Sequence, residues 1–288
     1  MLGVILDKLK LLGAEARKEL VDGLNDCDNS DYHADRKYLS SSVLKTVYKS
    51  LDIYYNEYIL GMKKEISNST QSTFDLGSLV HSYILEPHLV ENEYNFYKGF
   101  RKQGADYDLF LESVKKGKPV ISSPQHHQAK ELVEAYKRNK HASQLITNGF
   151  SEQTICGTLN GIPIKTRYDY INSDKGYIAD VKTTAYGSDL DSFKQTVDGL
   201  MYHLSAALYC SMASQHYGKP FDFYFIVLSK KDKTCNVFKM SEETMEKGKR
   251  IVTEACAKYK KAKETNSWTE LTEAGNLNLV DSDEIEEI

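Results

Sequence analysis

Three short segments in the second half of the chain constrain its fold more than any other feature. Residues 151–158, 162–171 and 176–184 have the periodicity of strands, and only short polar connections separate them. The first connection contains Asn160-Gly161, a favoured sequence for a two-residue hairpin turn, and the second spans residues 172–175. These turns predict an antiparallel meander of three strands.

Helical patterns lie on both sides of this meander. The elements expected before it are helices at 43–60 (begun by serines at 40–42), 74–87, 105–116 and 124–146, with a polar connector at 67–73. The elements expected after it are helices at 189–198 and 200–217, a strand pair at 221–229 and 234–240, and a helix at 241–263. This order predicts an α/β (α+β) fold, with a central mixed sheet flanked by helices and a helical N-terminal portion.

The two ends of the chain differ from its middle. Residues 1–37 predict an amphipathic helix followed by a polar loop at 25–37. The apolar stripe of that helix consists of Leu2, Ile5, Leu9, Leu12, Ala16 and Leu20. Residues 38–270 would form the main domain, and residues 271–288 an acidic, disordered tail. Alternatively, Ile285 and Ile288 among the acids of the tail could dock on a partner with a basic, apolar groove.

Composition limits the classes of protein to which this chain can belong. The last eight of its 288 residues carry five acids, so the formal charge of −4 becomes +1 for residues 1–280 and allows a local basic patch. Five cysteines without a C-x-x-C pair argue against a thiolate-bound zinc or iron–sulfur centre and indicate a reducing compartment. No apolar run approaches the ~20 residues that span a bilayer, and the first residues do not form a secretory signal. We expect a soluble, cytoplasmic protein without membrane contact.

Asp169, Asp180 and Lys182 lie in the second and third predicted strands. If this hairpin pairs around residues 172–175, Asp169 and Asp180 become neighbours across the ladder. Two like charges at such positions destabilise a sheet unless a cation or a proton offsets them. A divalent metal ion would do so, and carboxylate and backbone oxygens suit magnesium or manganese. Lys182 shares a face with Asp180 and could orient or deprotonate a water there, or stabilise a phosphate.

The D-x-K pattern alone has little specificity. Asp35-Arg36-Lys37 in the polar N-terminal loop also satisfies it, and a surface hairpin with a salt bridge would explain it equally well. The second instance differs because it lies in the apolar strand YIADVKTT, where an aspartate and a lysine each require a partner. We therefore favour a metal site for phosphodiester hydrolysis at this hairpin.

With these residues, the sequence resembles the PD-(D/E)XK nuclease superfamily. Within it, the sequence is most similar to the RecE-like (exonuclease VIII) group, whose members are relatives of the lambda-type phage exonucleases. The catalytic signature of the superfamily falls on Asp169 and on Asp180-Val181-Lys182. The leading helix of the RecE-like group reads L-G-x-x-x-H-x-x-x-L-E-P, which LGSLVHSYILEP matches with its histidine at His81. SSSVLKTVYKS and the segment ending on Trp268 also match, so the resemblance covers about residues 38–270.

The resemblance implies a restriction-endonuclease-like core and a DNA exonuclease that depends on Mg²⁺ or Mn²⁺. The implied metal ligands are His81, Asp169, Asp180 and the carbonyl of Val181. Lys182 would position the attacking water, while Thr183 and Thr184 would hydrogen-bond phosphate. The resemblance further implies a ring-shaped homo-oligomer that degrades linear duplex ends from the 5′ end and leaves single strands for a recombinase or annealing protein. It would act in the host cytoplasm if the chain is phage-encoded.

The chain departs from the pattern of the family at two positions. Tyr168 stands in place of the proline, with little chemical consequence. In the helix after the hairpin, Tyr209 fits the Q-x-x-x-Y pattern of RecB-like members, but Ser205 replaces the glutamine that lies near the scissile phosphate. Tyr209 and the shorter Ser205 are thus the expected substrate contacts of this helix. Glu152, in the first strand, is either a further acidic group of the site or an exposed strand-end residue.

Two alternatives to the exonuclease remain open at this point. An endonuclease or structure-specific nuclease could use the same core, because end dependence is set by surface loops and by the oligomer. A catalytically inactive DNA-binding protein would explain the missing glutamine, but it would not explain why both aspartates and the lysine are present.

Overall fold

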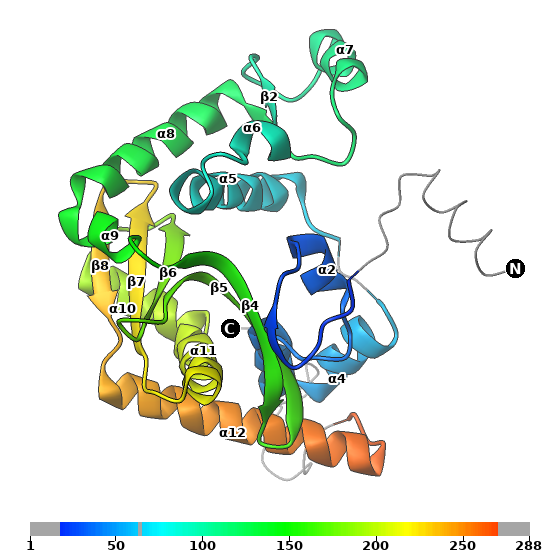
Figure 1. The fold of residues 1–288 in the computed structure, drawn as a ribbon. Helices are drawn as coiled ribbons and strands as arrows, with labels where there is room; N and C mark the ends of the chain where they lie inside the picture. The colour runs from blue at the N-terminus through cyan, green and yellow to red at the C-terminus, as the bar shows by residue number, and fades with distance from the viewer. Residues whose placement is uncertain (1–17, 63–64, 270–288) are drawn as a thin grey trace, which may run out of the picture.

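The computed structural model describes residues 18–62 and 65–269, and its centre is a six-stranded mixed sheet (Figure 1). The strand order is β1-β4-β5-β6-β7-β8, in which β6 and β7 are parallel and every other pair of neighbours is antiparallel. The strands are β1 (Gly23–Asn25), β4 (Phe150–Leu159), β5 (Ile162–Asn172), β6 (Tyr177–Thr184), β7 (Asp222–Ser229) and β8 (Cys235–Lys239). This confirms the predicted central mixed sheet.

The expected meander of β4, β5 and β6 is confirmed, and its first turn explains the register. Leu159 pairs with Ile162, so Asn160 and Gly161 alone form the turn. Both turn residues have positive φ, 52° and 76°, as the favoured two-residue hairpin turn requires. The turn therefore fixes which residues of β4 and β5 face each other along both strands.

Helices cover both faces of the sheet (Figure 1). The main helices of one face are α3 (Ser41–Lys49), α10 (Leu190–Gly199), α11 (Tyr202–Tyr217) and α12 (Glu242–Thr265). The helices of the other face are α5 (Asn68–Leu85), α6 (Val90–Glu93), α8 (Ser123–Arg138) and α9 (Lys140–Leu145). Each layer buries its own apolar cluster against the sheet, so β6 and β7 are apolar on both faces, as a parallel pair should be.

Two long predicted helices are interrupted in the structure, and a serine or asparagine marks each break. The predicted helix 43–60 ends at Ser50, whose extended backbone begins α4 (Leu51–Tyr54) and whose Oγ accepts from the Ile53 N–H at 3.2 Å. A π-helix, η1 (Tyr55–Ile59), follows. Helix 124–146 breaks at Asn139, which caps α9 through the Ala142 N–H. These side chains satisfy the free N–H groups of a new helix better than they continue the old one.

The polar segments were wrongly predicted as connections in two places. Residues 68–73 are the first turns of α5, capped by Ser67, whose Oγ accepts from the Thr70 N–H at 3.2 Å. The predicted loop 25–37 contains α2 (Asn29–Ala34), capped by Asp28. Further unexpected elements are α6, β1 and a two-stranded parallel sheet of β2 (Asn95–Tyr97) and β3 (Val120–Ser122). α7 (Ala105–Ser113) lies within the predicted helix 105–116.

Both chain ends contain predictions that lie outside the described residues. The predicted N-terminal helix does so except for Leu20, which is buried in a non-helical segment. The acidic tail at 271–288, with its docking hypothesis, lies outside them entirely. Within the described part of the chain, no helix combines the length and apolar character needed to cross a membrane.

Candidate active site

Strands β5 and β6 separate close to the turn that joins them. Their ladder pairs only residues 170–172 with residues 177–179. Beyond it, β5 stays paired with β4, while β6 follows β7. At the point of separation the Val181 N–H donates to Asp169 Oδ2 at 2.8 Å. A carboxylate thus takes the place of a backbone acceptor and holds Asp169 in the fork of the sheet.

Three acidic residues stand at matching positions on the three strands of the meander. Ser151 pairs with Tyr170 and Gln153 with Tyr168, so Glu152 lies opposite Asp169. The ladder of β5 and β6, extended by one residue beyond Tyr170, would bring Asp169 opposite Asp180. Such a row of carboxylates is unfavourable unless cations are close. The fork therefore concentrates negative charge at one point of the sheet.

His81 joins this row from α5. Its Nδ1 lies 3.4 Å from Asp169 Oδ2, and one ligand atom each of His81, Glu152 and Asp169 lie within 4.8 Å of one another. α5 reaches the sheet closely at Gly77, where a Cβ would lie 3.4 Å from Thr183 Oγ1. One imidazole nitrogen with several carboxylate oxygens is a donor set that fits a divalent cation such as Mn²⁺ or Mg²⁺.

Asp180 and Lys182 form a buried ion pair beside this cluster. The side-chain ammonium of Lys182 contacts Asp180 Oδ2, and it lies 3.4 Å from the Val181 carbonyl oxygen. Burial raises the pKa of the Asp180 carboxyl, although Lys182 opposes this shift. Burial also disfavours the charge on Lys182, but the carboxylates of Asp180 and Asp169 outweigh it and raise the pKa of the lysine. Each charge of this pair thus depends on the other.

Glu152 is held by an arginine from the neighbouring strand. Arg167 Nε donates to Glu152 Oε2 at 2.7 Å, and the same guanidinium donates to the Cys27 carbonyl at 2.9 Å. Burial and the nearby Asp169 raise the pKa of Glu152. Its backbone is left-handed, with φ 51°, which costs a non-glycine residue roughly 1–2 kcal/mol. Strain of this kind persists only where surrounding contacts hold it.

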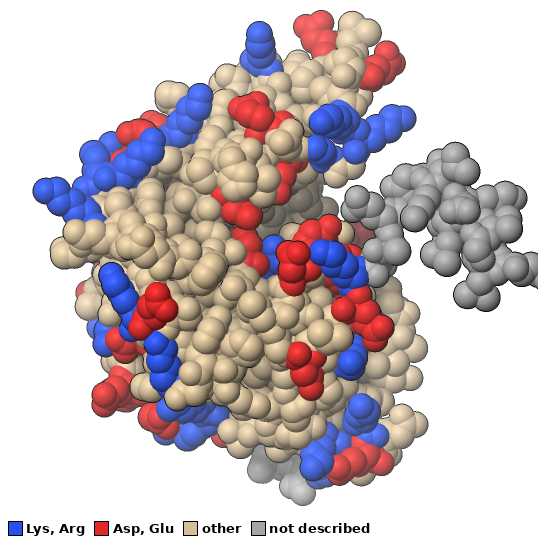
Figure 2. Space-filling view, in the orientation of Figure 1, with Lys and Arg blue, Asp and Glu red and all other residues tan. Residues whose placement is uncertain are grey.

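A cavity of about 1120 Å³ opens onto the cluster between α5 and the N-terminal segment. Its wall includes the three clustered side chains together with the acids Asp26, Asp28, Asp31, Glu86 and Glu93. Figure 2 shows acidic side chains gathered around the hollow at the centre of this face. Such a mouth attracts cations and repels phosphate. The cavity thus leads to a cluster of donor atoms that suits a cation.

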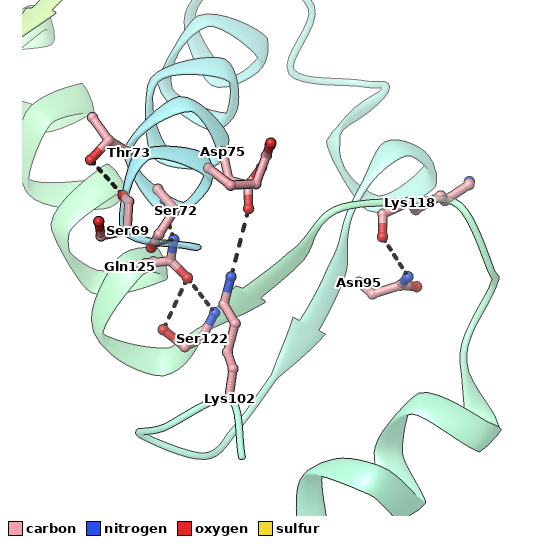
Figure 3. A network of polar contacts seen from close by, with 10 residues as sticks. Ser69, Ser72, Thr73, Asp75, Asn95, Lys102, Lys118, Ser122 and Gln125 are labelled. Atoms are coloured by element: carbon pink, nitrogen blue, oxygen red, sulfur yellow. Dashed lines mark hydrogen bonds and ion pairs between the residues drawn. The ribbon is translucent and has the colours of Figure 1, made fainter. Parts of the chain in front are cut away.

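Contacts at the N-terminal end of α5 attach this helix to α8. Gln125 Nε2 donates to the carbonyl and to the hydroxyl of Ser72, at 3.1 and 2.9 Å, while its Oε1 accepts from Ser122 (Figure 3). Lys102 reaches Asp75 on α5 at 3.7 Å. These contacts fix the end of α5 that precedes Gly77 and His81, and so support the position of the histidine.

The predicted substrate residues lie in different surroundings. Tyr209 lines the cavity and packs edge-on against Tyr168 at 5.4 Å between ring centroids. Ser205 is half-buried, one turn before Tyr209 on α11. The Thr183 hydroxyl faces Gly77 of α5. The hydroxyl of Thr184 accepts from the Tyr186 N–H at 3.0 Å, and this bond closes the turn after β6.

Lys45 is a residue near the site that sequence reasoning missed. Its Nζ lies 5.1 Å from the ring centroid of Tyr202, and Lys182 Nζ lies 5.5 Å from the same centroid. Lys45 comes from α3, which is far from the hairpin in sequence, so no spacing rule connects the two. Only the packing of α3 on α11 brings them together.

Comparison with known proteins adds a family and a fold. Residues 40–282 match the family described as "PDDEXK-like domain of unknown function (DUF3799)". A crystal structure named "Putative exonuclease" from Eubacterium rectale is similar with a TM-score of 0.61 and 19% identity, over 91% of this chain and 97% of that one. At this identity the likeness shows the fold. No curated protein matches the sequence.

A second solved structure, SSO0001, is less similar. Its TM-score is 0.36 at 14% identity, over 89% of this chain and 86% of that one.

Proposed function

Since this chain belongs to the family of PDDEXK-like domains, we propose that it is a metal-dependent nuclease that hydrolyses phosphodiester bonds of DNA. The observation that carries the proposal is the acidic row in the fork of the sheet. Glu152 and Asp169 face each other on neighbouring strands, His81 lies 3.4 Å from Asp169, and a lysine is paired with Asp180. Metal ligands next to a fixed cation are a combination that can promote hydrolysis of a phosphodiester.

The proposed metal ligands are His81, Asp169, Asp180 and the carbonyl of Val181, with Glu152 as an additional carboxylate. A bound Mg²⁺ or Mn²⁺ would polarise the phosphate and make water a better nucleophile. The chain itself supplies the orientation of these ligands. The Val181 N–H fixes Asp169, and Arg167 fixes Glu152.

Lys182 is the proposed electrostatic group of the site. Its ion pair with Asp180 holds the ammonium at the edge of the fork, next to the Val181 carbonyl. From there it would orient the attacking water and stabilise the charge that develops on the phosphate. Tyr209, Ser205 and the Thr183 and Thr184 pair are proposed to contact the substrate around it.

We further propose an exonuclease that acts on linear duplex ends, from 5′ to 3′, and produces single strands for recombination. The name of the Eubacterium rectale structure supports an exonuclease, and the resemblance to the RecE-like group supports the polarity. The same resemblance leads us to propose a homo-oligomer, a recombinase or annealing protein as partner, a cytoplasmic location, and residues 38–270 as the nuclease domain.

Digestion of linear duplex DNA, labelled separately at its 5′ and 3′ ends, tests this function. With Mg²⁺ we expect release of the 5′ label, and loss of at least about a hundredfold in rate in Asp180→Asn. Asp222→Asn is the matched control, because Asp222 pairs with Lys239 at the surface, away from the fork.

A covalently closed circle distinguishes the modes of cleavage. An exonuclease leaves it intact, whereas cutting of the circle would identify an endonuclease. If no divalent metal supports cleavage of either substrate, the nuclease proposal is wrong and a DNA-binding protein remains.

A further inference from the structure

Lys45 carries a charge that the described structure compensates only in part, through the Asp180 carboxylate that is already paired with Lys182. It lies half-buried on α3, and within residues 18–62 and 65–269 no carboxylate forms an ion pair with it. Burial and the neighbouring Lys182 lower the pKa of Lys45 to about 8. An ammonium group in such a place is unfavourable unless an anion joins it. The position is therefore suited to a negatively charged ligand.

The nearest charged groups of the site do not supply a carboxylate partner for Lys45. Lys182 shares the ring of Tyr202 with Lys45, and its own carboxylate partner is Asp180. The two ammonium groups are thus accompanied by one closely paired carboxylate. An anion with more than one oxygen acceptor would compensate the remaining charge.

The packing of α3 on α11 builds a surface around Lys45. Ser41, one turn before Lys45, lies close to the Tyr209 side chain, while Lys45 lies against Tyr202. Residues 202, 205 and 209 are spaced to share one face of α11, so Ser205 stands between the two tyrosines. From this spacing we infer that Lys45, Tyr202 and Ser205 lie along one strip beside the fork.

We propose that Lys45, Ser205 and Tyr202 form an anion site for a DNA phosphate next to the one that is cleaved. The proposal rests on the proposed nuclease function and names a part of its substrate-binding surface. Lys45 and Lys182 both approach the Tyr202 ring, but only Lys182 is paired with Asp180. We therefore assign Lys45 to a neighbouring phosphate and Lys182 to the reacting one. The lysine ammonium is a compact charge with three N–H donors, so it can bind a phosphate in several orientations.

The distribution of charge also indicates from which side the DNA strand reaches the site. The cavity mouth on the α5 side is rich in acids, whereas Lys45 and Lys182 lie on the α3 and α11 side. A polyanion is attracted to the second side and repelled by the first. The strand therefore enters along α3 and α11.

Substitution of Lys45 by methionine, which keeps the length of the side chain, tests the site. We expect KM for linear duplex DNA to rise about tenfold while kcat stays within a factor of about three, because a neighbouring phosphate is bound equally in ground and transition states. Binding of a short fluorescent duplex in EDTA, where hydrolysis does not occur, should weaken in parallel. The slope of log affinity against log salt should fall by about 1.

Matched variants separate charge from packing. Lys45→Arg should keep affinity within about threefold, because the charge remains. Lys239→Met removes one exposed surface lysine that is paired with Asp222, and should leave both affinity and salt slope unchanged. Lys45→Gln replaces Lys45→Met if the melting temperature shows that the methionine variant does not fold.

Two outcomes would overturn the anion site. In one, Lys45→Met binds DNA with the affinity and salt slope of the unmodified chain. In the other, Lys45→Arg is as impaired as Lys45→Met, so that packing rather than charge explains the effect. If the unmodified chain binds DNA in this charge-dependent way but cleaves no DNA with any metal, the nuclease function fails while the anion site stands.

Discussion

Glu152 combines two unusual features in a single residue. It faces Asp169 on the neighbouring strand, and its backbone is left-handed, with φ 51°. The bond from Arg167 holds its carboxylate toward the cluster that contains His81. Backbone strain and charge repulsion thus coincide at the residue where a metal ion would relieve the repulsion.

Glycine and alanine at position 152 should separate strain from charge. Both remove the carboxylate and should lower metal-dependent activity alike. Glycine accepts positive φ without a steric cost, so Glu152→Gly should be more stable to urea than Glu152→Ala by about 1 kcal/mol. At Gln153, which has no positive φ, glycine should instead be less stable than alanine. Equal stability of the two Glu152 variants would show that the backbone there is not strained.

The sequence contained more of this site than its motifs suggested. Counting back from the Asn160-Gly161 turn places Glu152 opposite Asp169, so register alone could have selected it over an exposed strand end. Counting residues in the same way across the turn at 172–175 places Asp169 opposite Asp180. His81 came from the family resemblance, because a lone histidine on an apolar helix does not reveal its partner. Lys45 depends on helix packing across the fold, which no local pattern encodes.

Among the elements, α5 brings His81 to the sheet. Its approach to β6 leaves room for only a small residue at Gly77, one turn before the histidine, because a Cβ there would already contact Thr183 Oγ1 at 3.4 Å. Its first turns consist of small polar residues, which the sequence pattern assigns to a connection. The Ser67 cap and the bonds between Ser72 and Gln125 stabilise those turns as helix, and both depend on contacts that periodicity does not report.

Side chains of different size at position 77 should test how α5 positions His81. Gly77→Ala puts a methyl group at an ordinary contact distance of 3.4 Å, and alanine favours a helix, so stability should be kept or raised by up to ~1 kcal/mol. Gly77→Leu should push α5 away from β6, cost about 1–3 kcal/mol and weaken Mn²⁺ binding. Thermal melting and Mn²⁺ titration of both variants measure this. Tight Mn²⁺ binding by Gly77→Leu would contradict the role of α5.

In the whole molecule, the two helical layers meet different parts of the site. The α5 layer brings His81 to the fork, and the α3–α11 layer brings Lys45 close to Lys182 of β6. An aromatic cluster ties α4 to the end of α12: Trp268 lies 5.3 Å from Tyr54 and 5.9 Å from Tyr259 between ring centroids. None of these rings lines the cavity of the site. The cluster therefore stabilises the layer without touching the chemistry.

Removal of the Trp268 ring should lower stability without changing the chemistry. We expect Trp268→Ala to lose about 2–4 kcal/mol of the free energy of unfolding, and Trp268→Phe to lose less. At a temperature where the variants are folded, their cleavage rates should match that of the unmodified chain. Urea unfolding and DNA digestion measure the two effects. A rate loss in folded Trp268→Ala would show that the cluster also shapes the site.

The measurement that tests the central claim most directly is the binding of Mn²⁺, followed by the electron paramagnetic resonance signal of the free ion. If the fork is a metal centre, the unmodified chain removes free Mn²⁺ from solution. Asp169→Asn should then bind at least about tenfold more weakly, because it loses the carboxylate that His81 and the Val181 N–H share. Asp222→Asn, in the same sheet, should bind normally. Equal Mn²⁺ binding by Asp169→Asn and the unmodified chain would contradict the account.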